Sequence, residues 1–285
     1  MTGVSAPIAV LASRVRADEK RVLSELDRRG VGYEHVDTRA LWGFLGHADG
    51  RIVLNREIGQ VRAHYAASLF EQAGARVLNS ARAIGTCGDK WHCSVALARA
   101  GVPTPETALA LTPEGALEAF DAVGYPAVVK PLVGSWGRLV TAVPDREVAA
   151  TVLEYVRALP NPQSHVVYVQ RMIPKPDRDI RVIVVGDEPV GATYRRGEQW
   201  RTNVARGAVS EPCALTPEIT ALALGATRAV GADIAGVDLI EDVDGALTVL
   251  EVNHGVEFSG FQAALGDAVD VAARIVDHLV AEAAT

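Results

Sequence analysis

The chain has 285 residues, of which 49% are hydrophobic and 22% charged, and its formal net charge is −7. These values are typical of a globular protein with room for about two domains, and the negative charge argues against nonspecific nucleic-acid binding. No apolar run approaches the ~20 residues of a membrane span, and residues 1–7 lack the basic region of a secretory signal. Cys87, Cys93 and Cys213 form no CxxC pair, which favours reduced thiols in the cytoplasm over disulfides or a zinc site.

The first part of the chain, residues 1–87, alternates predicted strands and helices. Apolar spacing and the stop signals Gly30 and Gly74 predict strands over 8–13, 32–37, 52–54 and 77–78 and helices over 18–29 and 61–73. Alternation of this kind predicts a parallel sheet. No GxGxxG follows the first strand, so a dinucleotide-binding domain has little support.

The middle part, residues 88–164, contains two lysines and a glycine-containing loop. Helices are predicted over 90–100, 113–124 and 145–159, and strands over 125–129 and 139–143. Lys90 begins the first helix, and Lys130 ends an apolar strand, where a buried ammonium group needs a partner. The loop Gly134-Ser135-Trp136-Gly137-Arg138 joins two strands and lacks the GxxxxGK[ST] pattern. Its backbone suits phosphate oxygens, although most such hairpins bind nothing.

The third part, residues 165–285, contains a predicted hairpin with oxygen ligands at one end. Strands over 235–241 and 246–253 flank a turn at 242–245, and a final helix is predicted from about Gln262 to Ala281. The hairpin brings together Asp238, Glu251 and Asn253, because residues i and i+2 of a strand share a face. Carboxylate and amide oxygens suit Mg²⁺. For this motif alone, a solvated hairpin end is the more common interpretation.

Basic residues cluster in the same part of an otherwise acidic chain. A single member is more often part of a solvated charged face, whereas the cluster favours an anion site, since arginine donates two parallel hydrogen bonds to carboxylate or phosphate. The cluster comprises Lys175, Arg178, Arg181, Arg195, Arg196, Arg201 and Arg206.

Taken in order, these blocks resemble the ATP-grasp superfamily over nearly the whole chain. The matching blocks are Asp89-Lys90, Val129-Lys130-Pro131 with the glycine loop, 169–173, 178–182, Tyr194-Arg195-Arg196, 203–207, and Asp238 with Glu251-Val252-Asn253. Within the RimK-like ligases, the chain is most similar to the LysX-like group of carrier-protein-dependent lysine and arginine biosynthesis. That narrower resemblance rests on residues 87–91, 134–139 and 251–254.

The resemblance implies an α/β ATP-grasp fold: an N-terminal parallel α/β domain (1–87), a central subdomain with a glycine-rich lid (88–164), and a C-terminal subdomain with the magnesium site (165–285). It also implies a reaction in which ATP phosphorylates a carboxylate and an amine attacks the acyl phosphate. ATP is then a co-substrate, and two magnesium ions are expected, held by Asp238, Glu251 and Asn253. A homo-oligomer, dimer or tetramer, is typical of related ligases.

Further roles follow from the same resemblance. Arg206 and Asn203 are expected to stabilise the acyl phosphate and the tetrahedral intermediate. The expected substrate-binding residues are Arg195, Arg196, Asn203, Arg206, Gly260 and Phe261. The expected ATP-binding residues are Lys90, Lys130, Gly134, Ser135, Trp136, Gly137, Arg138, Gln170, Arg171, Met172, Ile173, Asp179 and Arg181.

The implied substrates are the γ-carboxylate of the C-terminal glutamate of a small acidic amino-group carrier protein and the α-amino group of glutamate or 2-aminoadipate. Gly260-Phe261 resembles the pair of glutamate-directed members, and Phe261 would shorten the pocket, although one methylene gives only ~1–3 kcal/mol of discrimination. Phe261 is alternatively a core aromatic residue. Arg171 stands where a glutamate is common, and Arg206-Gly207-Ala208 lacks a second glycine.

Other interpretations remain open. The same reaction with 2-aminoadipate or a non-standard amino acid fits the motifs, as does glutamate ligation to another protein tail or a free dipeptide. From another class, the chain would be an ATP-binding regulatory module without turnover. Retention of the two lysines, the three oxygen ligands and Arg206 argues against that last alternative.

Overall fold

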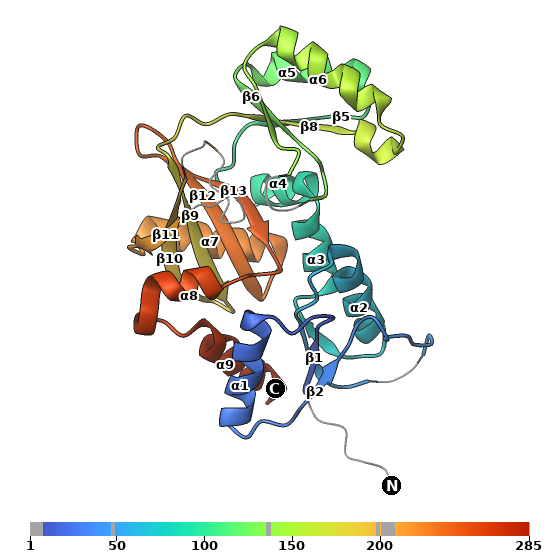
Figure 1. Cartoon of the computed structure of the whole chain (residues 1–285), viewed down its shortest axis with the longest axis vertical. Coiled ribbons are helices and arrows are strands. Elements are labelled where there is room, and N and C mark those ends of the chain that lie inside the picture. The colour runs from blue at the N-terminus through green and yellow to red at the C-terminus, as the bar shows by residue number, and fades with distance from the viewer. Residues whose placement is uncertain (1–7, 47–48, 135–137, 198–199, 201–208, 285) are drawn as a thin grey trace.

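The computed structural model describes residues 8–46, 49–134, 138–197, 200 and 209–284. The N-terminal part is a four-stranded parallel sheet in the order β2-β1-β3-β4, which confirms the predicted parallel sheet. Its strands are β1 (Ile8–Leu11), β2 (Tyr33–Val36), β3 (Ile52–Asn55) and β4 (Arg76–Leu78), and its helices are α1 (Ala17–Arg28), α2 (Gln60–Gln72) and α3 (Ala81–Gly88). Figure 1 shows this part at the lower end of the molecule.

Helix α3 was not predicted from the sequence. It has eight residues and contains Gly85 and Gly88, which have low helix propensity. Its start is nevertheless marked by Ser80, whose hydroxyl accepts a hydrogen bond from the Ala83 N–H at 3.1 Å. A capped short helix therefore connects the N-terminal sheet to the helix that begins at Lys90.

The middle part is an antiparallel sheet in the order β5-β8-β6-β7. Helices α5 (Pro113–Val123) and α6 (Arg146–Ala158) pack on it, and they begin at the predicted signals Thr112 and Asp145. β8 follows the expected boundary at 164/165 but pairs with β5 and β6, so this strand is part of the middle sheet. The strands are β5 (Thr107–Ala110), which was not predicted, β6 (Ala127–Lys130), β7 (Thr141–Val143) and β8 (Val167–Arg171).

The third part is a five-stranded antiparallel sheet in the order β11-β10-β9-β12-β13. The predicted hairpin is confirmed, and Asp238 lies directly opposite Glu251. Helix α4 (Lys90–Arg99) precedes this part in sequence, yet Cys93 and Leu97 pack into its core together with α7 (Pro217–Val230). The strands are β9 (Arg178–Val185), β10 (Glu188–Arg196), β11 (Val209–Cys213), β12 (Ile234–Glu241) and β13 (Leu247–Asn253).

The single final helix predicted from Gln262 to Ala281 is wrong. The structure has two helices, α8 (Ser259–Leu265) and α9 (Val271–Ala283), with a 3₁₀ turn over Gly266–Ala268 between them. Gly266 has a φ of 58°, a conformation that ends α8 and that glycine adopts readily. Asp270 then starts α9, because its carboxylate accepts the Ala273 N–H at 2.9 Å.

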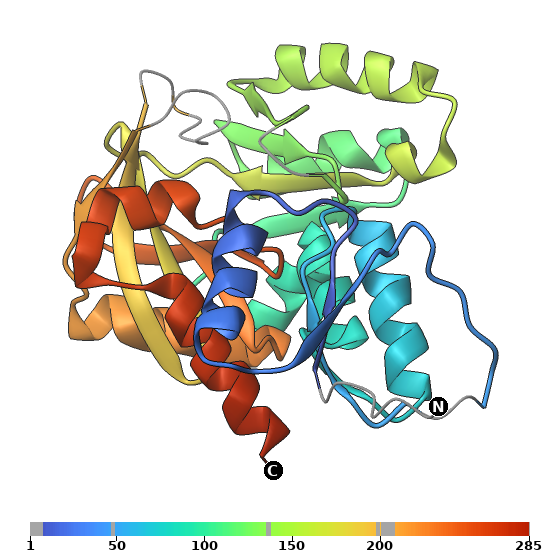
Figure 2. The ribbon, with the colours of Figure 1, turned by 60° about the horizontal axis from the view of Figure 1, so that its bottom comes forward.

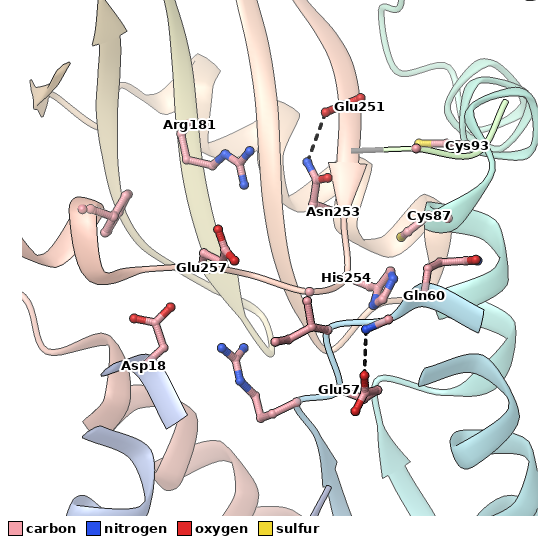
Figure 3. Close-up of a pocket in the computed structure, with 18 of the residues that line it drawn as sticks. Asp18, Glu57, Gln60, Cys87, Cys93, Arg181, Glu251, Asn253, His254 and Glu257 are labelled. Carbon is pink, nitrogen blue, oxygen red and sulfur yellow. Dashed lines mark hydrogen bonds between the residues drawn. The ribbon is translucent and has the colours of Figure 1, made fainter. Parts of the chain in front are cut away.

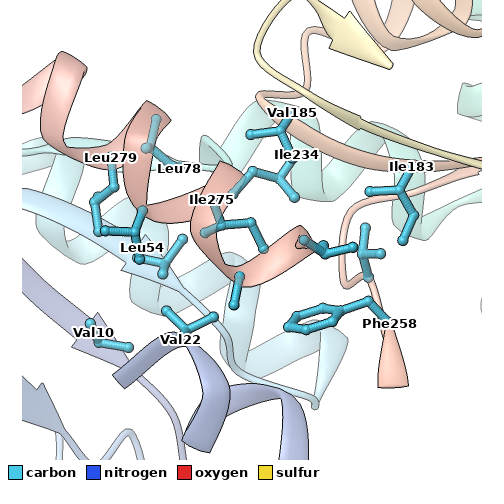
Figure 4. Packing of buried hydrophobic residues seen from close by; sticks show 14 of the residues in the cluster. Val10, Val22, Leu54, Leu78, Ile183, Val185, Ile234, Phe258, Ile275 and Leu279 are labelled. Carbon is cyan, nitrogen blue, oxygen red and sulfur yellow. The ribbon is translucent and has the colours of Figure 1, made fainter. Parts of the chain in front are cut away.

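Helix α9 lies between the N-terminal sheet and the third sheet (Figures 1 and 2). Figure 4 shows that Ile275 and Leu279 of α9 pack in the same apolar cluster as Val10 of β1 and Ile183 of β9, beside Phe258. This shared core joins the first and third parts of the chain. No helix among the described residues is long and apolar enough to cross a membrane.

Candidate active site

Two adjoining cavities lie between the parts of the molecule. The larger, of about 810 Å³, is enclosed by the N-terminal part, α3, α4 and the third sheet, and the smaller, of about 270 Å³, lies between the middle and third sheets. In Figure 3, the larger cavity is bordered by Arg181, Glu251 and Asn253 of the third sheet, Cys87 and Cys93 of the helices, and Asp18 and Glu57 of the N-terminal part. The residues common to both cavities are Lys90, Lys130, Gly134, Arg195, Leu250 and Glu251.

The two predicted lysines meet at this junction. Lys90 is the first residue of α4, which Asp89 caps by accepting the Trp91 and His92 N–H groups, and Lys90 Nζ donates to the Gly134 carbonyl at 2.9 Å. Lys130 is buried at the end of β6, and its Nζ donates to Gln170 Oε1 at 2.6 Å. Burial, reinforced by Lys90 and opposed by Glu251, lowers the pKa of Lys130 to about 8.

The three predicted oxygen ligands lie together at the end of the hairpin. Asn253 Nδ2 is 3.4 Å from both Asp238 Oδ2 and Glu251 Oε1. Burial raises the pKa of Asp238 to about 6, although Arg181 and Arg195 act in the opposite direction. Burial also acts to raise the pKa of Glu251, but the nearby cations, led by Lys90 and Lys130, outweigh it and lower the pKa.

This donor set fits a magnesium ion. Two carboxylates and an amide are hard oxygen ligands. The amide oxygen and nitrogen of Asn253 exchange by rotation of the side-chain amide, so the oxygen can face the carboxylates. Among the described residues, Glu251 has one hydrogen-bond contact, at 3.4 Å to Asn253, whereas Asp238 is also held by two arginines. The residues that would hold the ion are therefore Glu251 and Asn253, with Asp238 beside them.

The predicted arginines differ in their environment. Arg195 is 6% exposed and pairs with Asp179 at 2.6 Å and with Asp238 at 3.1 Å, while Arg181 also contacts Asp238. Burial lowers the pKa of Arg195, but the two carboxylates outweigh it and raise the pKa. Arg196 points to the other side of β10, is exposed and pairs with Glu211, so it does not line either cavity.

The expected adenine-side residues line the smaller cavity, together with Arg138, Lys175 and Asp179. Gln170 is buried. Its amide oxygen accepts from Lys130, and its amide nitrogen donates to Tyr168 Oη at 2.8 Å and to Thr107 Oγ1 at 3.1 Å. Arg171 stands where a glutamate is common, and its exposed side chain pairs with Glu106 on the neighbouring segment. Met172 and Ile173 follow it along the same wall.

Gly260 and Phe261 line the larger cavity. Phe261 is 4% exposed and belongs to the apolar cluster of α9, so it is a core aromatic residue and a cavity residue at once. A Cβ atom on Gly191 of β10 would lie 2.8 Å from Leu265 Cδ1 and 3.2 Å from Phe261 Cζ. The glycine therefore allows α8 to pack closely on the third sheet.

Sequence reasoning missed the N-terminal wall of the larger cavity. Its residues follow β1 and β3, the central pair of a parallel sheet at whose carboxyl ends the strand order reverses, where α/β proteins commonly bind ligands. The strand–helix alternation that predicted a parallel sheet could also have predicted a binding site at the carboxyl ends of these strands. The residues are Arg16, Asp18, Arg56, Glu57, Gly59 and Gln60.

Glu57 in this wall is a buried carboxylate with a full set of partners. It accepts hydrogen bonds from the Ser13 and Gly59 N–H groups at 3.0 and 2.8 Å and from the Thr38 hydroxyl. Burial acts to raise its pKa, but these donors outweigh it and lower the pKa to about 2. His254, missed too, also lines the cavity, and burial together with Arg56 lowers its pKa to about 4.

Some predicted site residues lie outside the described part of the chain. These are Ser135, Trp136 and Gly137 of the glycine loop, and Asn203 and Arg206.

Comparisons with known proteins identify the family of the chain. Residues 87–279 match the RimK-like ATP-grasp domain, and residues 8–86 match the LysX preATP-grasp domain. The glutamate–LysW ligase ArgX of Sulfolobus acidocaldarius is 31% identical over 276 residues, which are 95% of this chain and 97% of that protein. The alpha-aminoadipate–LysW ligase LysX of Saccharolobus solfataricus is 36% identical over 211 residues, 74% of this chain and 77% of that protein.

A solved structure gives the same result for the fold. The ATP-grasp RimK domain protein of Sphaerobacter thermophilus has a TM-score of 0.79 to this chain at 26% identity, covering 96% of this chain and 99% of that one. The predicted ATP-grasp fold is thereby confirmed. From these matched domains and relatives, this chain belongs to the RimK-like ATP-grasp family and is an ATP-dependent carboxylate–amine ligase.

Proposed function

We propose that this ligase joins the γ-carboxylate of the C-terminal glutamate of a small acidic amino-group carrier protein to the α-amino group of glutamate, through an acyl phosphate. The relative from S. acidocaldarius, which aligns with 95% of the chain, is named for glutamate and LysW. The presence of Gly260-Phe261 in the cavity wall supports glutamate as the amino acid, because Phe261 would close a pocket one methylene shorter.

The junction of the two cavities carries the proposal. Nucleotide phosphates in the smaller cavity would reach the larger one at Lys90, Lys130 and Glu251. Among the described residues, the larger cavity is lined by six lysines and arginines against four aspartates and glutamates, in a chain whose net charge is −7. A local excess of cations suits two substrates that carry carboxylates. The cations are Arg16, Arg56, Lys90, Lys130, Arg181 and Arg195.

Different residues of the chain would act in the two steps of the reaction. Lys90 and Lys130 would offset phosphate charge while the γ-phosphoryl group passes from ATP to the tail carboxylate, releasing ADP. The amine then attacks the acyl carbon, phosphate leaves with its bridging oxygen, and the amine loses a proton to form the amide. Magnesium, when bound, would neutralise charge on the phosphates. We assign stabilisation of the tetrahedral intermediate to Arg206 and Asn203.

The test combines purified enzyme, ATP, magnesium, glutamate and a LysW-type carrier protein ending in glutamate. We expect the mass of the carrier to rise by one glutamyl residue, with ADP formed in equal amount. Added 2-aminoadipate in competition should give less conjugate than glutamate. An unmodified carrier, with transfer to another protein tail or a free glutamyl dipeptide, would contradict the carrier assignment.

A variant pair tests the site itself. Glu251→Ala should abolish ADP formation, because the junction loses the carboxylate that faces both lysines. Glu241→Ala is the matched control, since it lies on the same hairpin and pairs with Arg178 outside both cavities. Turnover by the Glu251 variant at the wild-type rate would remove this residue from the site.

A further inference from the structure

We propose that Asp18 is a positioning residue for the acceptor amino acid. Its carboxylate, from the N-terminal part, holds residues 257–261, the turn that leads into α8 and includes the first three residues of that helix, which is one wall of the larger cavity. The inference rests on the proposed function for the identity of the acceptor, but the contact itself stands on the geometry alone.

Asp18 makes two hydrogen bonds to this turn. Its Oδ2 accepts the Phe258 N–H at 2.8 Å, and its Oδ1 accepts the hydroxyl of Ser259. Asp18 is 4% exposed and Phe258 is fully buried, so the bond between the Asp18 carboxylate and the Phe258 N–H is largely shielded from water. A buried carboxylate or N–H without a partner is costly, which makes this contact specific for the observed position of the turn.

Among the described residues, the backbone of the turn has few other polar partners, such as the Gln262 N–H, which donates to the Phe258 carbonyl at 2.7 Å. Helix α8 begins at Ser259 without a side-chain cap of its own. Gly255 precedes the turn and Gly260 lies within it, and neither position is crowded. Packing of the Phe258 ring holds the turn in the core, but hydrogen bonds are directional and packing is not. Asp18 therefore supplies a directional constraint, through both a backbone N–H and a hydroxyl, on the segment that carries Gly260 and Phe261.

Neighbouring contacts connect the same two parts of the chain. Arg16 pairs with Glu257, and the Arg56 guanidinium lies 5.7 Å from the centroid of the Phe258 ring. Both arginines also pair with the buried Glu19 of α1. The N-terminal part thus holds the turn from one side, while α8 packs on the third sheet from the other.

The consequence is a cavity wall assembled from segments 240 residues apart. A shift of the wall by about 1 Å would misplace the acceptor amine relative to the acyl phosphate, and misplacement on this scale costs up to about a hundredfold in rate. Neither Asp18 nor the turn is among the described residues that line the smaller cavity, where the nucleotide is proposed to bind. Loss of the contact should therefore change the use of the amino acid and leave that of ATP intact.

The experiment compares Asp18→Ala, Asp18→Asn and the control Asp270→Ala. Asp270 is also an aspartate that accepts a backbone N–H at the start of a helix, but it lies outside both cavities. In Asp18→Ala, we expect the KM for glutamate to rise about tenfold with the carrier protein saturating, while the KM for ATP changes less than about twofold. In Asp18→Asn, the KM for glutamate should rise less than in Asp18→Ala, because the amide oxygen still accepts the Phe258 N–H. Asp270→Ala should keep both KM values.

A second measurement is independent of any substrate. Hydrogen–deuterium exchange of the peptide covering residues 256–261 should rise in Asp18→Ala, stay near wild type in Asp18→Asn, and remain unchanged in Asp270→Ala. Unchanged exchange in Asp18→Ala would overturn the anchoring role, and so would equal increases in the KM for glutamate and for ATP. A wild-type enzyme that conjugates no amino acid would overturn the proposed function, while the exchange result would still decide whether Asp18 holds the turn.

Discussion

Lys130 is a buried lysine whose charge depends on pH in the range where its proposed role in phosphate binding can be tested. Burial lowers its pKa to about 8, so the amine loses its proton near physiological pH, and the protonated form is the one that attracts phosphate. We therefore expect the ATP affinity of the free enzyme to fall about tenfold between pH 7 and pH 9. Calorimetric titration with ATP across this range measures the fall.

A conservative change at Gln170 provides the control for this pH dependence. Gln170→Glu places a carboxylate where the amide oxygen now accepts from Lys130 Nζ, which should raise the pKa of the lysine and move the fall in affinity to higher pH. ATP affinity that is the same at pH 7 and pH 9 in the wild-type enzyme would contradict a phosphate-binding role for Lys130.

Arg195 and Arg196 are sequence neighbours with different expected effects on stability. Arg195→Ala leaves Asp179 and Asp238 buried without this partner, and breaking a buried pair typically costs about 3–5 kcal/mol. Arg196→Ala removes an exposed pair with Glu211, which should change the free energy of unfolding by about 1 kcal/mol or less. Urea denaturation of the two variants compares them, and equal small losses would show that the buried carboxylates find other partners.

At the scale of elements, the close approach of α8 to β10 depends on Gly191 of β10, which has no side chain. In Gly191→Ala, the new Cβ would meet Leu265 and Phe261, so we expect a loss of about 1–3 kcal/mol from overpacking. The KM for the amino acid should rise as well, since Phe261 lines the larger cavity. Thermal denaturation and initial rates measure the two effects.

Gly225→Ala on α7 is the matched substitution. A Cβ there would make ordinary contact with Val102 at 3.5 Å, and alanine in a helix is favoured over glycine by about 1 kcal/mol. This variant should be at least as stable as wild type. If both alanine variants keep wild-type stability, then α8 can move away from β10 more easily than the close contacts of Leu265 and Phe261 indicate.

At the scale of the whole molecule, Asn79 joins the N-terminal sheet to the third sheet. Its amide nitrogen donates to the Ile234 and His254 carbonyls at 2.7 and 3.0 Å, and its oxygen accepts from the Asp233 and Ile234 N–H groups at 2.6 and 2.9 Å. The side chain is 3% exposed and uses its full hydrogen-bonding capacity. It therefore connects two parts that are far apart in sequence.

We expect Asn79→Ala to lower the free energy of unfolding by about 3 kcal/mol or more, because several buried backbone groups lose their partner together. Asn55→Ala is the control, since its side chain bonds Ala63 O and Glu57 N, both within the N-terminal part. Its cost should be about 1 kcal/mol. Equal effects in chemical denaturation would mean that the apolar core alone holds the parts together.

Local patterns predicted most elements, because helix spacing, caps and strand runs depend on near neighbours. Thr112 and Asp145 start their helices as expected, and the turn between β12 and β13 forms where the sequence predicted it. The exact partner of Asp238 was set by a β-bulge at Leu250, which shifts the register by one residue and brings Glu251 opposite Asp238. The prediction failed where the local signal was weak or ambiguous, as for short β5 and α3 and for Gly266, which ends a helix inside an apolar run.

By itself, then, the sequence determined most of the elements, because they depend on periodicity and on caps in consecutive residues. The ATP-grasp fold and the residue types of the site followed from the resemblance of its motifs to a known family. Only the tertiary structure decided which charges face each other. Arg195 is directed to Asp179 and Asp238 while Arg196 faces outward, and Asp18 reaches a turn 240 residues away. The physical reason is that pairing between distant segments depends on how the sheets and helices pack, and no local pattern records that packing.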